Sequence, residues 1–297
     1  MGTIVRINIT NRRTPDELAV INLRYRSNGV EHSSNVRFEL KPLWEFGRET
    51  DSTAFDFLVL SVIVYNVDRL LNRNLHSNDG WKRDIILEGV PARNAATMNA
   101  ASTQFEKSIS FLTGDKWTIR FSQQQSWNYN PQTDKNYDRQ EYAKVALFSG
   151  GLDSLIGFVD EAYSLGVDEK MLLISHVEQG KEGADQTGIV DYCHDNQIFE
   201  GRYERIKSSV SLERSSFVNK EASESTFRSR SLLFFAMGIY CAHSINNNIP
   251  LIVPENGTIS INIPLNPSRR SACSTRTTHP VFMKRLEEAL RAIGIQN

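Results

Sequence analysis

The sequence predicts an α/β protein in which a doubly wound parallel sheet follows a smaller α+β domain. Two observations lead to this prediction. From residue 143 onward, short apolar strands alternate with amphipathic helices, which is typical of a parallel sheet with helices on both faces. A glycine-rich turn, Ser149-Gly150-Gly151-Leu152-Asp153-Ser154, joins the first of these strands to the next helix. In such sheets this turn lies at the carboxyl edge, where ligands bind.

The first domain is predicted to combine strands and helices. Ile4–Thr10 alternates apolar and polar residues, which indicates a half-buried strand. Apolar residues at helical spacing predict helices from about Thr53 to Leu71 and from about Ala101 to Leu112. Lys116–Ser122 alternates again and predicts a second strand. These elements indicate an α+β unit.

A polar stretch without periodicity, residues 123–142, predicts a linker between domains of residues 1–122 and 143–297. The predicted strands of the second domain are Lys144–Phe148, Met171–Ser175 and Leu251–Val253, and its predicted helices are Leu155–Leu165, Gln186–Asn196, Arg228–Asn246 and Pro280–Ile293.

Charge and composition restrict the partners and the compartment. Lys and Arg total 34 against 35 Asp and Glu, a net charge of -1, so no global field draws the chain to nucleic acid or to a membrane. No apolar stretch is long enough to cross a bilayer, and no signal-peptide core is present. We therefore expect a cytoplasmic protein without a membrane or nucleic-acid partner. Cys193, Cys241 and Cys273 are too few for a disulfide framework and form no C-x-x-C pair, so we expect inert thiols.

The glycine-rich turn has the features of a phosphate-binding loop. Gly150 and Gly151 let backbone N–H groups point at an anion, and the following helix adds its positive dipole end. Ser149 and Ser154 add hydroxyl donors. Asp153 would repel phosphate unless it holds a cation such as Mg2+ or caps the helix, and we favour the cation. The alternative is a simple Gly-Gly turn with a serine cap.

Further polar residues follow the other predicted strands. His176 and Gln179 come after the second strand, where they would meet a base or a substrate edge, although a solvated loop has the same pattern. Arg228 and Arg230 open an apolar helix, a position that favours negative charge. A bound anion would resolve this conflict, and an ordinary surface ion pair is the alternative.

The third predicted strand is followed by the longest polar stretch. Glu255 and Asn256 come first, and Arg269 and Arg276 lie among many Ser and Thr residues before Pro280 opens a helix. Because this stretch connects a strand to a helix inside the domain, we expect a polar binding loop rather than a disordered one.

The chain contains neither G-x-x-x-x-G-K-[ST] nor G-x-G-x-x-G, and its hexapeptide resembles the PP-loop, S-G-G-x-D-S, of the ATP pyrophosphatases. Residues 144–280 resemble the 7-cyano-7-deazaguanine synthase (QueC) branch of that superfamily through the PP-loop, the Arg228–Phe234 stretch and Glu255-Asn256-Gly257. Within this branch, the chain more closely resembles the QueC-like proteins of bacterial anti-phage defence systems, a group that includes QatC. The segments that resemble this group specifically are Tyr65-Asn66-Val67-Asp68-Arg69, Phe111-Leu112-Thr113-Gly114-Asp115 and residues 266–280.

One part of the QueC pattern does not occur here. QueC-type enzymes carry a four-cysteine zinc site after the matching region, whereas this sequence ends at Asn297 with only Cys273 nearby. The resemblance therefore implies zinc without evident ligands, and we expect either a truncated C-terminus or a protein that works without the metal.

The resemblance implies that ATP adenylates the carboxylate of 7-carboxy-7-deazaguanine and that pyrophosphate is released. An amine then takes the acyl group: ammonia in preQ0-type synthases, and in the defence group the N-terminus of a partner from the same operon, a QatB-like protein. We assign Asp153, Arg228 and Arg230 to catalysis, Ser149, Gly150, Gly151, Leu152, Asp153, Ser154 and His176 to ATP, Asp153 to Mg2+, and Gln179, Glu255, Asn256, Arg269 and Arg276 to the substrate. A tRNA-modifying PP-loop enzyme, which the near-neutral charge disfavours, and a non-catalytic scaffold of a defence complex stay open.

Overall fold

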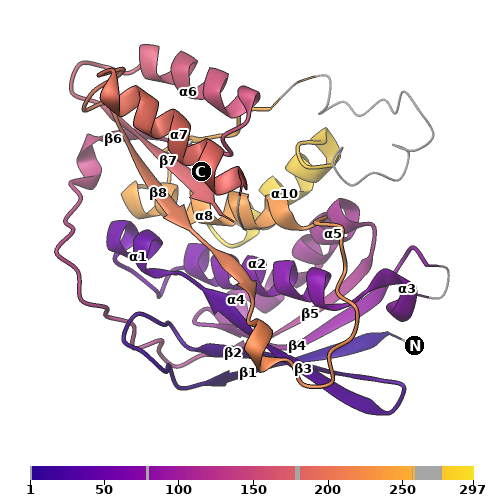
Figure 1. The fold of residues 1–297 in the computed structure, drawn as a ribbon. Coiled ribbons are helices and arrows are strands. Elements are labelled where there is room, and N and C mark those ends of the chain that lie inside the picture. Colours follow the sequence, from indigo (N-terminus) through magenta and orange to yellow (C-terminus); the bar gives the residue numbers. More distant parts are fainter. Residues whose placement is uncertain (1, 78–79, 178–180, 256, 258–275) are drawn as a thin grey trace.

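Two sheets of different size organise the chain in the computed structural model (Figure 1), which describes residues 2–77, 80–177, 181–255, 257 and 276–297. The larger sheet has six strands in the order β5-β4-β1-β2-β3-β9. Its strands are β1 (Thr3–Thr10), β2 (Val20–Ser27), β3 (Val30–Phe38), β4 (Asp84–Ala92), β5 (Lys116–Gln123) and β9 (Val210–Leu212). β1, β2 and β3 form an antiparallel meander, whereas β4 and β5 run parallel to β1.

The smaller sheet is parallel and has the order β10-β6-β7-β8. Its strands are β6 (Tyr142–Leu147), β7 (Lys170–His176), β8 (Tyr203–Ser208) and β10 (Leu251–Ile252). Leu147 and Leu172 face one apolar core, while Ala146 and Leu173 face another. Both faces of this sheet are therefore buried, which explains why β6 and β7 are almost continuously apolar.

Helices cover both faces of the parallel sheet. α6 (Leu152–Tyr163) and α7 (Lys181–Asp195) lie on one face, and α8 (Arg230–Ile245) lies on the other (Figure 1). α2 (Thr53–Leu70) fills the space between α8 and the six-stranded sheet, and most residues of both helices are buried. A single apolar core consequently connects the two sheets.

The remaining helices lie around this core. α5 (Ser102–Thr113) packs against β5 and against α10 (Pro280–Ala292). The short helices are α1 (Lys41–Gly47), α3 (Arg73–His76) and α4 (Ala95–Ala100), and two 3-10 turns span Arg139–Glu141 and Arg214–Ser216. Among the described residues, no helix combines the length and the apolar character needed to cross a bilayer.

The α/β class is confirmed, and so are the predicted strands and helices within a few residues. α6 begins at Leu152, three residues before its predicted start, because the glycine-rich turn of Ser149–Gly151 runs directly into the helix. The segment from 124 to 138 contains no helix or strand, but Trp127 and Tyr129 are buried against Phe55 and Trp44. Strand β9 belongs to the second half of the sequence and still pairs with β3 of the first half. The two halves are thus joined through a shared sheet.

Candidate functional site

The glycine-rich loop leaves the carboxyl end of β6 and opens α6. Gly150 has φ +79°, a left-handed conformation that favours glycine. Ser154 Oγ donates a hydrogen bond to the Gly151 carbonyl at 2.8 Å, and Ser149 Oγ lies 3.3 Å from Ser154 Oγ. Gly151 is the N-cap of α6, and no side chain caps the helix. The first N–H groups of α6 are therefore available to an anion.

Asp153 lies in the first turn of α6, and its side chain is half-buried. The capping alternative is wrong for this residue, because Gly151 occupies the N-cap position without any side-chain cap. Among the described residues, no ion pair or hydrogen bond engages the Asp153 carboxylate. A carboxylate next to a phosphate site is suited to Mg2+, which is typically held by one or two carboxylates together with substrate phosphates.

A chain of hydrogen bonds supports the loop from behind. Gln186 of α7 is fully buried, and its Nε2 donates to the carbonyls of Ser149 (3.2 Å) and His176 (3.3 Å). Arg205 of β8 in turn donates to the backbone carbonyl and to Oε1 of Gln186, both at 3.1 Å, and to Ser175 Oγ. Burial lowers the pKa of Arg205. Sequence reasoning missed Gln186 and Arg205 as supports of the loop, because neither belongs to a recognisable motif.

His176 ends β7 and is fully buried beside the site. Its ring makes edge contacts with Tyr65 and Phe234, with centroid distances of 5.6 and 5.4 Å. Burial, followed by the positive charge of Arg230, lowers the pKa of His176 to about 4, and the imidazole is neutral at pH 7. Neither ring nitrogen makes a hydrogen bond of ordinary geometry with the described residues, although a polar interaction with the Val210 backbone opposes the pKa shift.

The predicted arginines Arg228 and Arg276 meet at one turn of the first half of the chain. Arg228 is buried, stacks over Trp81 at 4.4 Å and donates from Nη1 to the Thr113 carbonyl at 3.0 Å. Arg276 donates from Nη1 to the Phe111 carbonyl at 2.7 Å. A Cβ on Gly114 would lie 3.4 Å from Arg228 Nη1 and 3.5 Å from Arg276 Nη1, so the two guanidinium groups lie on the same turn.

Two further arginines extend this group. Arg230 is the first residue of α8 and lies over Phe234 at 5.5 Å, close enough to influence His176. Arg69, which sequence reasoning did not assign a role, lies over the rings of Tyr65 and Phe227 at 5.5 and 5.0 Å. Arg69, Arg228, Arg230 and Arg276 form what we call the arginine cluster. Arg69 and Arg230 adjoin the glycine-rich loop through His176, whose carbonyl accepts from Gln186, and Arg228 and Arg276 form the part of the cluster at Gly114.

A buried ion network anchors the start of α8 to the first half of the chain. Asp68 and Asp115 share the guanidinium groups of Arg73 and Arg83, and all four side chains are buried. Burial raises the pKa of Asp115, but hydrogen bonds and charges from the two arginines outweigh it and lower the pKa overall. Asp68 Oδ2 also accepts hydrogen bonds from Ser229 N (3.0 Å) and Oγ (2.8 Å). The network therefore fixes the residue between Arg228 and Arg230.

Of the other predicted site residues, the structure describes Leu152 and Glu255. Leu152 is 70% exposed at the start of α6, and Glu255 follows β10 by three residues. Gln179, Asn256 and Arg269 lie outside the described residues. The structure thus brings the loop, His176 and Arg230 to one edge of the parallel sheet, whereas Arg228 and Arg276 lie at Gly114 and donate to carbonyls of the first half of the chain.

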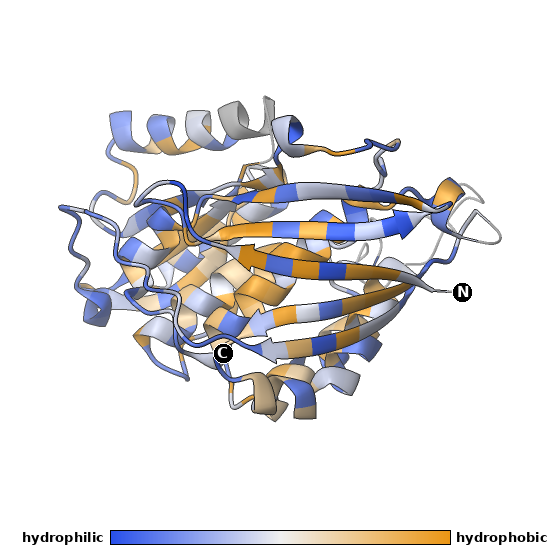
Figure 2. Cartoon of the chain, turned by 90° about the horizontal axis from the view of Figure 1, so that it is seen from below, coloured by the Kyte–Doolittle hydropathy of each residue, from blue (hydrophilic) through white to orange (hydrophobic). Residues whose placement is uncertain are grey.

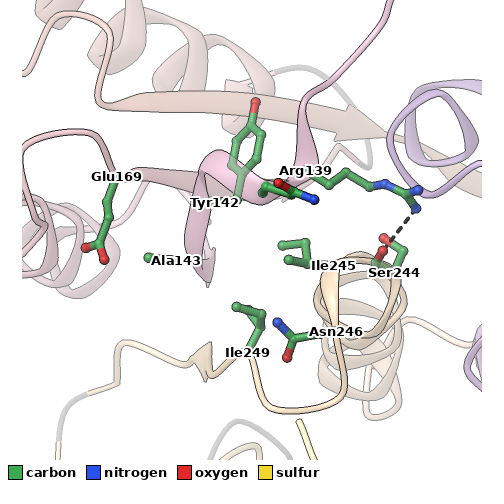
Figure 3. Close-up of a pocket in the computed structure, with 9 residues that line it drawn as sticks. Arg139, Tyr142, Ala143, Glu169, Ser244, Ile245, Asn246 and Ile249 are labelled. Carbon is green, nitrogen blue, oxygen red and sulfur yellow. Dashed lines mark hydrogen bonds between the residues drawn. The ribbon is translucent and has the colours of Figure 1, made fainter.

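A cavity of 670 Å³ lies at the opposite edge of the sheet, at the amino ends of β6 and β7 (Figure 3). Arg139 points toward Ser244 there and donates to the carbonyls of Ser244 and Gly47, both at 3.0 Å. Glu169 accepts a hydrogen bond from Gly166 N at 2.7 Å. The two charged residues that line this cavity, Arg139 and Glu169, are thus hydrogen-bonded within the protein. Ligands of open α/β sheets bind at the carboxyl edge of the sheet, not at this edge. We therefore place the candidate site at the phosphate loop.

The zinc that the QueC resemblance implies has no ligand set in the described part of the chain, where no group of three or more His, Cys, Asp or Glu side chains is placed to hold a metal. Cys193 and Cys241 are buried free thiols, and burial raises the pKa of both. Cys273 lies outside the described residues. The absence of such a group does not bear on Mg2+ bound with a nucleotide, because the phosphates supply most of its ligands.

Comparisons of the chain with protein-family models, with curated proteins and with solved structures gave no match.

Proposed function

We propose that this chain is a PP-loop ATP pyrophosphatase that adenylates a carboxylate. The observation that carries the proposal is the loop of Ser149–Ser154. It follows a buried parallel strand, holds Gly150 at φ +79° and opens an uncapped helix with Asp153 in its first turn. Backbone N–H groups of the loop and helix are the donors that a Mg2+-bound triphosphate needs, and the Asp153 carboxylate, which no described residue pairs, is a ligand for the ion. The hydroxyls of Ser149 and Ser154 hold the loop in shape. The helices on both faces of the parallel sheet support a doubly wound nucleotide-binding fold.

The proposed chemistry follows from the charges at this edge. A substrate carboxylate oxygen attacks the α-phosphorus of ATP, the bond between the α- and β-phosphates breaks, and pyrophosphate leaves. The loop amides and the N-terminus of α6 hold the pyrophosphate portion, and Asp153 holds Mg2+. Arg230 stabilises the negative charge that develops on the phosphates. The neutral His176 adds no further positive charge and packs behind Arg230.

The proposed substrate is 7-carboxy-7-deazaguanine, as the QueC resemblance implies. The arginine cluster supports an anionic, planar substrate, because guanidinium groups pair with carboxylates and stack on flat rings. In the second step an amine attacks the acyl carbon and AMP leaves. We propose that this amine is the N-terminus of a QatB-like partner and that the reaction takes place in the cytoplasm, in anti-phage defence.

The test measures pyrophosphate release from ATP and Mg2+, with and without 7-carboxy-7-deazaguanine. The proposal predicts release that requires the acid, and a gain in the intact mass of the partner protein when it is added. Asp153→Asn should abolish release. Asp160→Asn, which removes an exposed carboxylate from the same helix, should retain it. ATP binding without any release would instead favour a scaffold. Conversion of the acid to its amide by ammonia, without the partner protein, would favour a preQ0-type synthase.

A further inference from the structure

The face of the six-stranded sheet that points away from α2 is open to solvent (Figure 2). Along each strand, residues alternate between the buried core and this face. The charged residues on the open face are Arg6, Arg24, Arg26, Arg37, Lys116 and Arg120, against Glu31, Asp84 and Glu88. Six basic residues minus three acidic residues leave a net charge of +3 on the strands of a chain whose total is -1.

Four of these residues form a row across adjacent strands. The register places Arg120 beside Glu88, Glu88 beside Arg6, and Arg6 directly opposite Arg24. Glu88 is shared, since its two oxygens lie 2.9 Å from Arg120 and 3.4 Å from Arg6. The row therefore has three positive charges and one negative charge. Arg26 lies two residues beyond Arg24, about 7 Å further along the same strand.

The arrangement is electrostatically unfavourable for the protein alone. Arg6 and Arg24 are directly opposed like charges, which destabilise a sheet. The register places Glu31 opposite Arg26, beyond ion-pair distance. Among the described residues, no carboxylate lies within ion-pair distance of Arg24, and Arg24 Nε donates to Asn22 Oδ1 at 2.8 Å. An anion bridging Arg6, Arg24 and Arg26 would remove the repulsion, and guanidinium groups bind phosphates in a two-pronged manner. We call Arg6, Arg24 and Arg26 the open-face arginines.

The chemistry of the face favours a nucleic acid over an acidic protein. Protein interfaces have an apolar core that is rich in aromatic residues and poor in charge. Here most positions around the open-face arginines are polar, namely Asn8, Asn22, Ser33 and Asn35 on the neighbouring pairs, and the half-buried pair of Ile4 and Ile86 is the apolar part of the face beside them. Phosphodiester backbones need only cations and polar donors. Since no aromatic residue of these strands points outward to stack on bases, the contact would be independent of sequence.

We propose that the open-face arginines bind the phosphate backbone of a nucleic acid. The near-neutral net charge of the whole chain disfavours a nucleic-acid partner. Because the side chains of each strand alternate between two faces, however, the open face of the sheet has a net positive charge that the total for the chain does not reveal. This function is separate from the adenylation site. Strands β1 and β2 lie on the other side of α2 from β6 and α6 (Figure 1), and the open-face arginines are on the exposed face of these strands.

The experiment measures binding of a labelled, mixed-sequence DNA duplex, and of its single strands, by fluorescence anisotropy between about 50 and 200 mM salt. Three phosphate contacts give a slope of log K against log salt of about -2.7, which is a loss of about 40-fold over this range. Arg24→Gln should reduce the slope by about 0.9 and weaken binding about eightfold at 100 mM salt. The triple Gln variant of the open-face arginines should lose the salt-dependent binding.

Matched controls make the result specific. Arg24→Lys keeps the charge and should keep the slope, while Arg291→Gln removes another exposed arginine, on α10, and should change nothing. Saturating ATP and the Asp153→Asn substitution should leave DNA binding unaltered, so a failure of the adenylation proposal would not affect this one. Undetectable binding at 50 mM salt, equal losses in Arg24→Gln and Arg291→Gln, or stronger binding of polyglutamate than of DNA would each overturn the proposal.

Discussion

Replacing Gly150 with alanine tests the loop most sharply, because two separate costs arise at this position. The φ of +79° places the residue in the left-handed region, where a side chain costs about 1–2 kcal/mol. A Cβ there would also lie 2.7 Å from Gln186 Cγ, 3.0 Å from Gln186 N and 3.1 Å from its Cα. Two of these atoms are backbone atoms that Arg205 and the turns of α7 hold in place, so this crowding costs a further 1–3 kcal/mol or so.

Gly201→Ala provides the matched control. Gly201 has φ +72°, and a Cβ there would meet nothing within 4 Å, so this substitution carries the backbone cost alone. The difference between the two variants isolates the crowding against Gln186. We expect the loop of Gly150→Ala to relieve that crowding by moving away from α7, at the expense of its phosphate contacts.

The assay measures the free energy of unfolding in urea and the Kd for ATP with Mg2+ in both variants. We expect Gly201→Ala to lose about 1–2 kcal/mol of stability and to keep its ATP affinity. Gly150→Ala should bind ATP about 5- to 150-fold more weakly, which is the crowding cost of about 1–3 kcal/mol expressed as affinity. Equal stability and equal ATP affinity of the two variants would refute the role of the Gly150–Gln186 contact.

Three further predictions follow from named groups. Asp153→Asn should abolish pyrophosphate release without changing the urea midpoint, whereas Asp160→Asn should leave both unchanged; an active Asp153→Asn enzyme would contradict the cation role. Asp115→Asn should cost about 3–5 kcal/mol in urea unfolding, because it leaves two buried arginines short of a counterion, and a loss below about 1 kcal/mol would contradict the network. The pKa of His176 falls from 6.5 to about 4 on folding, so the unfolded state binds the extra proton. Stability should therefore drop by about 3 kcal/mol as the pH falls from 6.5 to 4, and His176→Phe should remove that part of the pH dependence; an unchanged pH profile in His176→Phe would show that other groups cause it.

The strand, glycine-rich turn and helix around Ser149–Ser154 could be predicted because their information is local. An apolar strand, a Gly-Gly turn and an amphipathic helix follow one another within about twenty residues of Lys144. The same holds for α2, whose apolar residues recur at helical spacing. The Asn28-Gly29 pair also offered a local signal, since both residues have positive φ in the turn between β2 and β3. This dipeptide is a strong hairpin signal, and reading it would have identified two missed strands.

Other features depend on contacts that no local pattern records. β9 has only three residues and pairs with β3, which is more than 170 positions earlier in the chain. β8 reads Tyr203-Glu204-Arg205-Ile206-Lys207-Ser208, a polar sequence that gives no sign of a strand in a buried sheet. The parallel neighbour β7 supplies its hydrogen bonds. β8 is therefore a strand because it pairs with β7, and not because of a pattern in its own sequence.

The buried ion network could not be predicted from the sequence either. Asp68, Arg73, Arg83 and Asp115 are spread over almost fifty residues, and each alone has the character of a surface charge. Only the packing of α2, α5 and β4 brings them together and excludes water. The resemblance to defence proteins drew attention to the segments around Asp68 and Asp115, but not to the two arginines that pair with them.

The proposed adenylation is tested most directly by the identity of the products that form from ATP in the presence of this protein. With Mg2+, 7-carboxy-7-deazaguanine and an amine acceptor, adenylation predicts AMP and pyrophosphate in equal amounts, and neither product with Asp153→Asn. Without the amine, pyrophosphate should form together with the acyl-adenylate. Formation of ADP and phosphate would mean that the bond between the β- and γ-phosphates breaks instead. That result would contradict adenylation at the Ser149–Ser154 loop.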